Sequence, residues 1–170
     1  MYELGTLVLY DKGGVYKIEG VGTPPVRGTV GNYYKLCAVF SNSNEIIYTP
    51  VDGSSIMRPL ISPGEAANYL ALFARLEPQI VPSPRTADLA AHYRDLLNSH
   101  SVEDRLLLIK EIQVRQRELA RQKKRPSQLD SKYLKLAEKL ICEEFAVVLD
   151  TTPDLIRERL YAATERKATA

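Results

Sequence analysis

The sequence predicts an α+β protein in which a small β-rich domain precedes an all-helical domain. Two observations support this prediction. Residues 1–60 contain most of the glycines and short apolar runs rich in Val, Ile, Leu and Tyr, a pattern typical of strands and turns. From Ser62 onward, apolar residues recur with the helical period between capping signals. We therefore expect one domain over residues 1–61 and a second over residues 62–166 of the 170-residue chain.

Five apolar runs in the first domain predict five short strands, and the breaks between them carry Gly, Pro, Asn and Ser. This many short strands in a short segment favours a small, strongly bent β-barrel of the SH3/Tudor-like kind. Residues 1–60 contain five basic and five acidic residues, so nothing there indicates a nucleic-acid surface. The predicted strands cover residues 6–10, 15–21, 33–40, 46–51 and 56–60.

The second domain is predicted to contain about five helices, each opened by a capping residue. The third is long, and we expect it to continue to Arg125, where Pro126 stops it. Three prolines within residues 77–85 indicate a stiff connector between the first two helices. The expected capping residues are Ser62, Thr86, Ser101, Ser127 and Thr152.

Positive charge is concentrated on the third helix. Between Arg105 and Arg125, eight Lys and Arg residues stand against two Glu, a local charge of +6 in a chain of +2. At helical spacing Lys110, Arg117, Arg121 and Lys124 share one narrow edge. The commoner explanation of such a run is a solvated helix face whose basic end complements the helix dipole. The alternative is an edge that contacts nucleic-acid phosphates, and spacing alone does not separate the two.

Composition and hydropathy limit the class of protein. The chain is 45% hydrophobic and 26% charged, which is typical of a globular protein and excludes a disordered one. No apolar run approaches the ~18 residues of a membrane span, and the first residues do not form a signal peptide. We therefore expect a cytoplasmic protein of bacterial type.

Motifs that carry catalysis are missing from the sequence. It contains no P-loop, dinucleotide-binding turn, nucleophile elbow or metal-binding helix motif. Cys37 and Cys142 are far apart in apolar patterns, so we expect buried, reduced thiols rather than a zinc site. His92 and His100 have no second ligand at metal spacing. The sequence therefore favours a protein that is not an enzyme and has no cofactor or metal.

Several short motifs, in order along the chain, are similar to a known family. They are Leu-Gly-Thr-Leu-Val-Leu-Tyr at residues 4–10, Tyr-Tyr-Lys-Leu at 33–36, Ile-Ile-Tyr-Thr-Pro-Val at 46–51, Met-Arg-Pro-Leu at 57–60, Tyr-Arg at 93–94, and the segments 127–132 and 137–146. With the order of domains, they resemble the CarD/CdnL family of bacterial transcription regulators. The N-terminal module of that family is shared with the transcription-repair coupling factor.

The resemblance implies a Tudor-like module that docks on the β subunit of bacterial RNA polymerase by strand addition. It also implies a helical domain that contacts promoter DNA, without sequence preference, near the upstream edge of the transcription bubble and modulates the stability of the open complex. The implied polymerase-binding residues are Ile46, Ile47, Tyr48, Thr49 and Pro50. The candidate DNA-binding residues, from the resemblance and the basic edge together, are Arg85, Leu89, Arg94, Arg117, Arg121, Lys124, Lys132 and Lys135.

The sequence departs from the family at one position that matters for DNA. The family uses a Trp as a wedge at the open minor groove, whereas this chain has no Trp and aligns Leu89 there. Leu89 is either a smaller wedge or a core residue that packs with Tyr93 and Leu96. A second function stays open beside the first: a monomeric protein–protein adaptor whose sheet binds a partner strand and whose basic helix has no DNA role.

Overall fold

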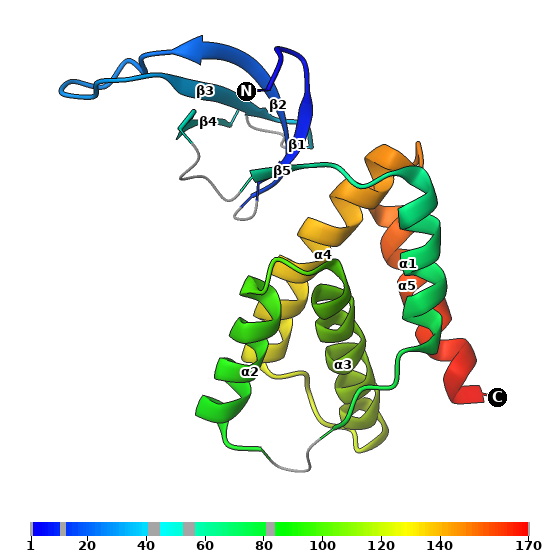
Figure 1. The fold of residues 1–170 in the computed structure, drawn as a ribbon. Coiled ribbons are helices and arrows are strands. Elements are labelled where there is room, and N and C mark those ends of the chain that lie inside the picture. Colours follow the sequence, from blue (N-terminus) through cyan, green and yellow to red (C-terminus); the bar gives the residue numbers. More distant parts are fainter. Residues whose placement is uncertain (1, 11–12, 41–44, 53–56, 81–83, 170) are drawn as a thin grey trace. The chain divides into compact units, whose positions relative to one another are not determined.

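The computed structural model describes residues 2–10, 13–40, 45–52, 57–80 and 84–169, and the side chains of these as far as residue 165. The chain forms two compact units, Met1–Ile61 and Ser62–Ala170. The first contains a five-stranded antiparallel sheet and the second contains five helices, which confirms the α+β class (Figure 1).

The strands of the first unit are β1 (Leu7–Tyr10), β2 (Gly14–Gly22), β3 (Tyr33–Ala38), β4 (Ile46–Pro50) and β5 (Met57–Pro59). Each overlaps a predicted strand and begins or ends within two residues of it; Ile56, at the predicted start of the last, lies outside the described residues. The strand order is β4-β3-β2-β1-β5, so among the described strands β4 and β5 are the two edges and do not pair to close the sheet.

One face of the sheet carries the apolar core of the first unit. Alternate residues of a strand point to the same face, and Tyr16 and Ile18 of β2 and Tyr34 and Leu36 of β3 are all at most 2% exposed. The register between β2 and β3 shifts by one residue between Ile18 and Gly20. A bulge of this kind bends the strand and increases its twist, which explains how a nine-residue strand follows a small curved sheet.

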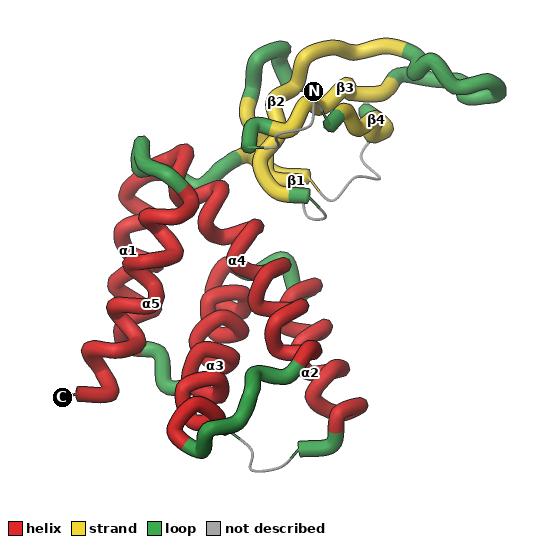
Figure 2. Tube along the Cα trace, turned by 180° about the vertical axis from the view of Figure 1, so that it is seen from behind, coloured by secondary structure: helices red, strands yellow, loops and turns green. Residues whose placement is uncertain are grey.

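The second unit consists of α1 (Pro63–Arg75), α2 (Thr86–Asn98), α3 (Val102–Arg121), α4 (Gln128–Val148) and α5 (Pro153–Thr169). Helices α3 and α4 occupy its centre, because each of them contacts all four of the other helices. Helix α2 packs on one side of this pair, and α1 and α5 pack on the other (Figure 2). The start of α2, the end of α3 and the start of α4 lie at the same end of the unit (Figure 1).

Four of the five expected helix caps are present. Ser62 and Glu65 form a complete capping box at α1, while Ser101 and Ser127 each accept a hydrogen bond from the backbone N–H three residues on. Thr152 does the same for Leu155 at 3.3 Å. The prediction for Thr86 is wrong: the N-cap residue of α2 is Arg85, whose side chain makes no capping hydrogen bond, and Thr86 is the first helical residue.

The predicted end of α3 is also wrong. The helix ends at Arg121, four residues before Arg125, in a turn where Lys124 N–H donates to Leu119 O at 2.8 Å and Lys123 N–H donates to Ala120 O at 3.0 Å. This pair of bonds is a Schellman motif, which requires a left-handed residue after the cap. Lys123 takes that conformation with φ of 56°, a position that usually favours glycine. Because no glycine marks this turn, Pro126 is the first residue in the sequence that predicts an end to the helix.

No helix in the described part of the chain is both long enough and apolar enough to cross a membrane.

Candidate functional site

The outer edge of β4 is the first candidate site, because it exposes backbone groups that a partner strand can pair with. β4 pairs with β3 in the register Lys35↔Tyr48, and no other described strand pairs with it. Backbone hydrogen bonds join Ala38 N–H to Glu45 O at 3.1 Å and Val51 N–H to Asn32 O at 3.1 Å, on either side of the strand. Antiparallel pairing alternates, so residues 47 and 49 also face β3. The N–H and C=O groups of Ile46 and Tyr48 therefore point away from the sheet.

The side chains of β4 alternate in the same way. Ile47 packs against the apolar core and Thr49 is 4% exposed, so both are on the inner face. Ile46 is 45% exposed, and Tyr48, opposite Lys35, is partly exposed on the outer face. Pro50 ends the strand and has no N–H to offer. The edge thus presents two donors, two acceptors and an apolar outer flank, which is sufficient for a short added strand.

The second candidate site is the end of the helical unit where α3 turns into α4. From Arg121 to Lys132 the chain has five basic residues and one acid, Asp130, which is fully buried. All five basic side chains are exposed. They are Arg121, Lys123, Lys124, Arg125 and Lys132, and we call them the basic turn. Arg85, the N-cap residue of α2, is also exposed.

The basic edge predicted along α3 is wrong at Lys110. Its side chain is buried, and its Nζ donates to the carbonyl of Phe73 at 2.7 Å and to that of Ala74 at 3.3 Å. The ammonium group also lies 4.8 Å from the centre of the Phe73 ring. Lys110 therefore completes the C-terminal end of α1, whose last carbonyls have no helical partner, and it is not available to a phosphate.

The other predicted DNA-binding residues differ in exposure. Arg94, Lys124, Lys132 and Lys135 are exposed. Arg121 is exposed, with Nη1 3.6 Å from the carboxylate of Glu118. Arg117 is partly buried in a shallow hollow beside Val114. Exposure therefore favours the basic turn over the length of α3 as a surface for phosphates.

Two residues of the basic turn, Lys123 and Arg125, were not among the DNA-binding residues predicted from the sequence. A helix that continues to residue 125 would direct them away from the predicted edge, and for that reason periodicity did not select them. Once the helix ends at Arg121, both lie in the turn beside Lys124. The run of basic residues immediately before Pro126 was the available signal.

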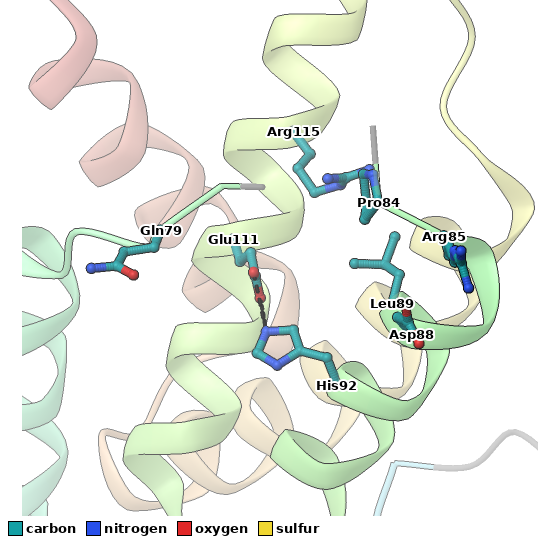
Figure 3. A pocket seen from close by; sticks show the side chains of 8 residues that line it. All are labelled: Gln79, Pro84, Arg85, Asp88, Leu89, His92, Glu111 and Arg115. Carbon is teal, nitrogen blue, oxygen red and sulfur yellow. Dashed lines mark hydrogen bonds and ion pairs between the residues drawn. The ribbon is translucent and has the colours of Figure 1, made fainter. Parts of the chain in front are cut away.

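A pocket of about 380 Å³ that contains charged groups lies between α2 and α3. Figure 3 shows Leu89 of α2 facing it, with Glu111 and Arg115 of α3 on the opposite wall. Leu89 is partly buried here rather than in the core, which Tyr93 of the same helix enters fully. Arg85, a predicted DNA-binding residue, lies at the rim.

Two polar pairs fix the positions of side chains that line this pocket: His92 with Glu111, and Arg115 with Asp130. His92 Nε2 lies 2.9 Å from Glu111 Oε2 and 3.1 Å from Oε1 (Figure 3). Burial raises the pKa of Glu111, and the adjacent His92 opposes that shift. Arg115 Nε lies 3.6 Å from Oδ2 of the buried Asp130 on α4, so its guanidinium is held between the pocket and the core.

The cysteines and histidines do not gather with acidic residues in the part of the chain that the structure describes. Among the described residues no group of three or more His, Cys, Asp or Glu side chains is arranged to hold a metal ion. Cys142 is buried as expected, and burial raises its pKa to about 12. Cys37 is a free thiol as expected, but its expected burial is wrong: it is only partly buried, and its Sγ lies 3.0 Å from a carboxylate oxygen of Glu19. Residues 37 and 19 are on neighbouring strands, on the face opposite the apolar core.

Comparison with models of known protein families finds no match, and comparison with curated proteins finds none either.

Proposed function

We propose that this chain is a non-enzymatic, monomeric regulator of bacterial transcription that acts in the cytoplasm. In this proposal its first unit is a Tudor-like module that adds a strand of the RNA polymerase β subunit to the edge at β4. Its helical unit contacts promoter DNA near the upstream edge of the bubble and modulates the lifetime of the open complex. The resemblance to the CarD/CdnL family supplies the identity of the partner, and the two candidate sites supply the chemistry.

The open edge at β4 is the observation that carries the proposal. Strand addition needs unpaired backbone donors and acceptors on the partner-facing side, and Ile46 and Tyr48 provide both. Ile46, 45% exposed, adds apolar surface that a partner strand would bury. The family resemblance assigns the same five residues, Ile46–Pro50, to polymerase.

The basic turn supports the DNA contact. Its cations are exposed and close together in the chain, and the one acid in the segment is buried. Clustered cations release counterions from a duplex, giving weak binding that depends on salt and not on base sequence. A contact of this kind beside a docked polymerase would act at high local concentration.

Polymerase binding is tested by substituting Tyr48 in the full chain. Tyr48→Pro removes the outward N–H without breaking a bond to β3, and proline is tolerated at edge positions whose N–H faces solvent. We expect this variant to retain the circular dichroism of the fold and to lose capture by the isolated polymerase β lobe. Tyr48→Phe keeps the backbone and is the matched control. Capture that is absent for the unsubstituted chain at low salt, or unchanged in Tyr48→Pro, contradicts the proposal.

A second candidate function is a protein–protein adaptor with no DNA role. Two observations favour it: Lys110 is buried against α1, and Arg121 lies near Glu118, so part of the predicted basic edge has a structural explanation. An adaptor would bind its partner through β4 with an affinity that does not change with salt. DNA binding with a steep salt dependence excludes this alternative.

A further inference from the structure

The pocket between α2 and α3 has three chemically different walls. Leu89 and Pro84 form an apolar wall, and the carboxylates of Asp88 and Glu111 supply hydrogen-bond acceptors (Figure 3). Arg85 and Arg115 supply the cationic groups. At about 380 Å³ the volume is within the range of sites that hold a small organic molecule, about 300–1,000 Å³. The pocket is thus suited to a ligand with an anionic end, a flat body and donor groups.

We propose that this pocket binds one unpaired nucleotide, with its phosphate on Arg85 and Arg115 and its base against Leu89 and His92 of α2. The inference rests on the proposed function, because it takes opened promoter DNA as the source of the nucleotide. It goes further in assigning a single-nucleotide site whose lining residues are separate from the basic turn.

The two arginine side chains suit a phosphate better than lysine ammonium groups would. The guanidinium fork matches phosphate geometry with two parallel hydrogen bonds. Arg115 has a side chain that is 17% exposed and is fixed by the buried Asp130, so its orientation is set before a ligand binds. Arg85 is exposed at the rim and is free of a capping bond to its helix.

The remaining walls fit a base. The His92 side chain is 47% exposed, and its ring is held from one edge by Glu111, which leaves ring surface for stacking. Unpaired bases stack on histidine and arginine planes as well as on larger aromatic rings. Carboxylates accept hydrogen bonds from the exocyclic amine of cytosine, so the acidic groups predict a preference for cytosine over thymine. Inorganic phosphate would leave all of these groups unused.

A paired base is too deeply stacked to enter such a pocket, so the nucleotide must be unpaired or extruded. The start of a bubble provides nucleotides of this kind, and holding one would favour the open state. A free mononucleotide has the same chemistry and is the second possible source.

The test is a titration of the full chain with deoxycytidine monophosphate, followed by NMR chemical shifts of the α2 and α3 amides. We expect saturable shifts for residues that line the pocket, and weaker binding of deoxycytidine, of thymidine monophosphate and of inorganic phosphate. Arg85→Gln should weaken the nucleotide about tenfold, the loss expected for one charge-assisted contact. Arg159→Gln, the same change at an exposed position of α5 outside the pocket, should leave this affinity unchanged.

Absence of shifts at millimolar nucleotide, or equal affinity for deoxycytidine, overturns the inference. So does an equal effect of the Arg85 and Arg159 substitutions. Binding to a blunt duplex, measured separately, distinguishes this failure from failure of the proposed function. If the duplex binds and the nucleotide does not, only the inference is lost. If the nucleotide binds and the duplex does not, the pocket is a free-nucleotide site and the DNA role is lost.

Discussion

The phenolic O–H of Tyr93 on α2 donates to Oδ1 of Asp130 on α4 at 2.7 Å, and both side chains are 0% exposed. Burial, and then the carboxylate, raise the pKa of Tyr93, so the phenol keeps its proton at any physiological pH. Asp130 also lies at the start of α4, where its backbone N–H donates to Ser127 Oγ at 3.0 Å. One residue thus joins the cap of α4, the packing of α2 and, through Arg115, the wall of the pocket.

Tyr93→Phe should destabilise the helical unit. It leaves an oxygen of the buried Asp130 without its hydrogen bond, and a bond to a charged group contributes about 1.5–3 kcal/mol. Urea unfolding monitored by circular dichroism should show a loss in this range. Tyr133→Phe removes a hydroxyl from a partly exposed ring in contact with Tyr93 and is the control. Equal stability of the two variants would show that the buried bond contributes little.

Lys110→Met should also destabilise the chain, even though it removes a charge from the interior. The carbonyls of Phe73 and Ala74 lose their donor, and the negative end of the α1 dipole loses a cation. We expect a loss of about 2 kcal/mol. Lys135→Met, at an exposed position of α4, should change stability by no more than about 0.5 kcal/mol. Similar values for both variants would contradict the structural role of Lys110.

Lys123→Gly should stabilise the chain, because Lys123 has φ of 56° and a left-handed conformation costs a non-glycine residue about 1–2 kcal/mol. Part of this gain is offset by the greater freedom of glycine in the unfolded chain, so we expect an increase of about 0.5–1 kcal/mol. Lys124→Gly removes the same charge next to it, where no left-handed conformation is required, and should be neutral or destabilising. A thermal melt of both variants separates backbone strain from charge.

Glu138 predicts a pH dependence of stability. Burial raises the pKa of Glu138 above its ordinary value of 4.5, against a smaller lowering by Arg157, whose Nε lies 3.9 Å away. Above pH 4.5, and up to the raised value, the folded chain holds more protons than the unfolded chain, so this group reduces stability as pH rises through that window. Glu138→Gln removes the effect. Its unfolding free energy, relative to the unsubstituted chain, should increase as pH rises from 4.5 through the raised pKa. A difference that is constant with pH would contradict a buried, hard-to-ionise Glu138.

The secondary structure was predicted well from the sequence, because helices, strands and turns depend largely on local residue patterns. Short apolar runs bounded by turn residues located β2 and β3, and capping residues located the starts of α1, α3 and α4. Strand order was not predictable to the same extent, since it depends on contacts such as Lys35 with Tyr48 between residues distant in sequence. The position of β4 at the edge of the sheet therefore follows from the strand order in the structure and not from the sequence pattern.

The candidate site was predicted less well, for a related reason. Helical spacing assigned Lys110 to a surface edge, but its environment is set by where α1 ends, at Phe73 and Ala74. The pocket requires α2 and α3 to pack side by side, so neither the pairing of His92 with Glu111 nor the position of Leu89 was visible in the sequence. Contacts between elements, rather than composition, decide which charged residues are available to a partner.

DNA binding by the helical unit should depend on salt through a small number of exposed cations. The logarithm of the affinity for a duplex should fall linearly with the logarithm of salt concentration, with a slope of about −0.9 for each phosphate contacted. Reversing the charge of Lys132 and of Arg94, both exposed, should flatten the slope by about one unit for each residue that contacts a phosphate. Arg159→Glu, an equal change of charge at an exposed position of α5, is the matched control for net charge.

Fluorescence anisotropy with one duplex at several salt concentrations gives all the slopes. If the three variants show the same slope as the unsubstituted chain, these residues do not contact DNA; if all flatten it equally, only net charge matters and no defined surface exists.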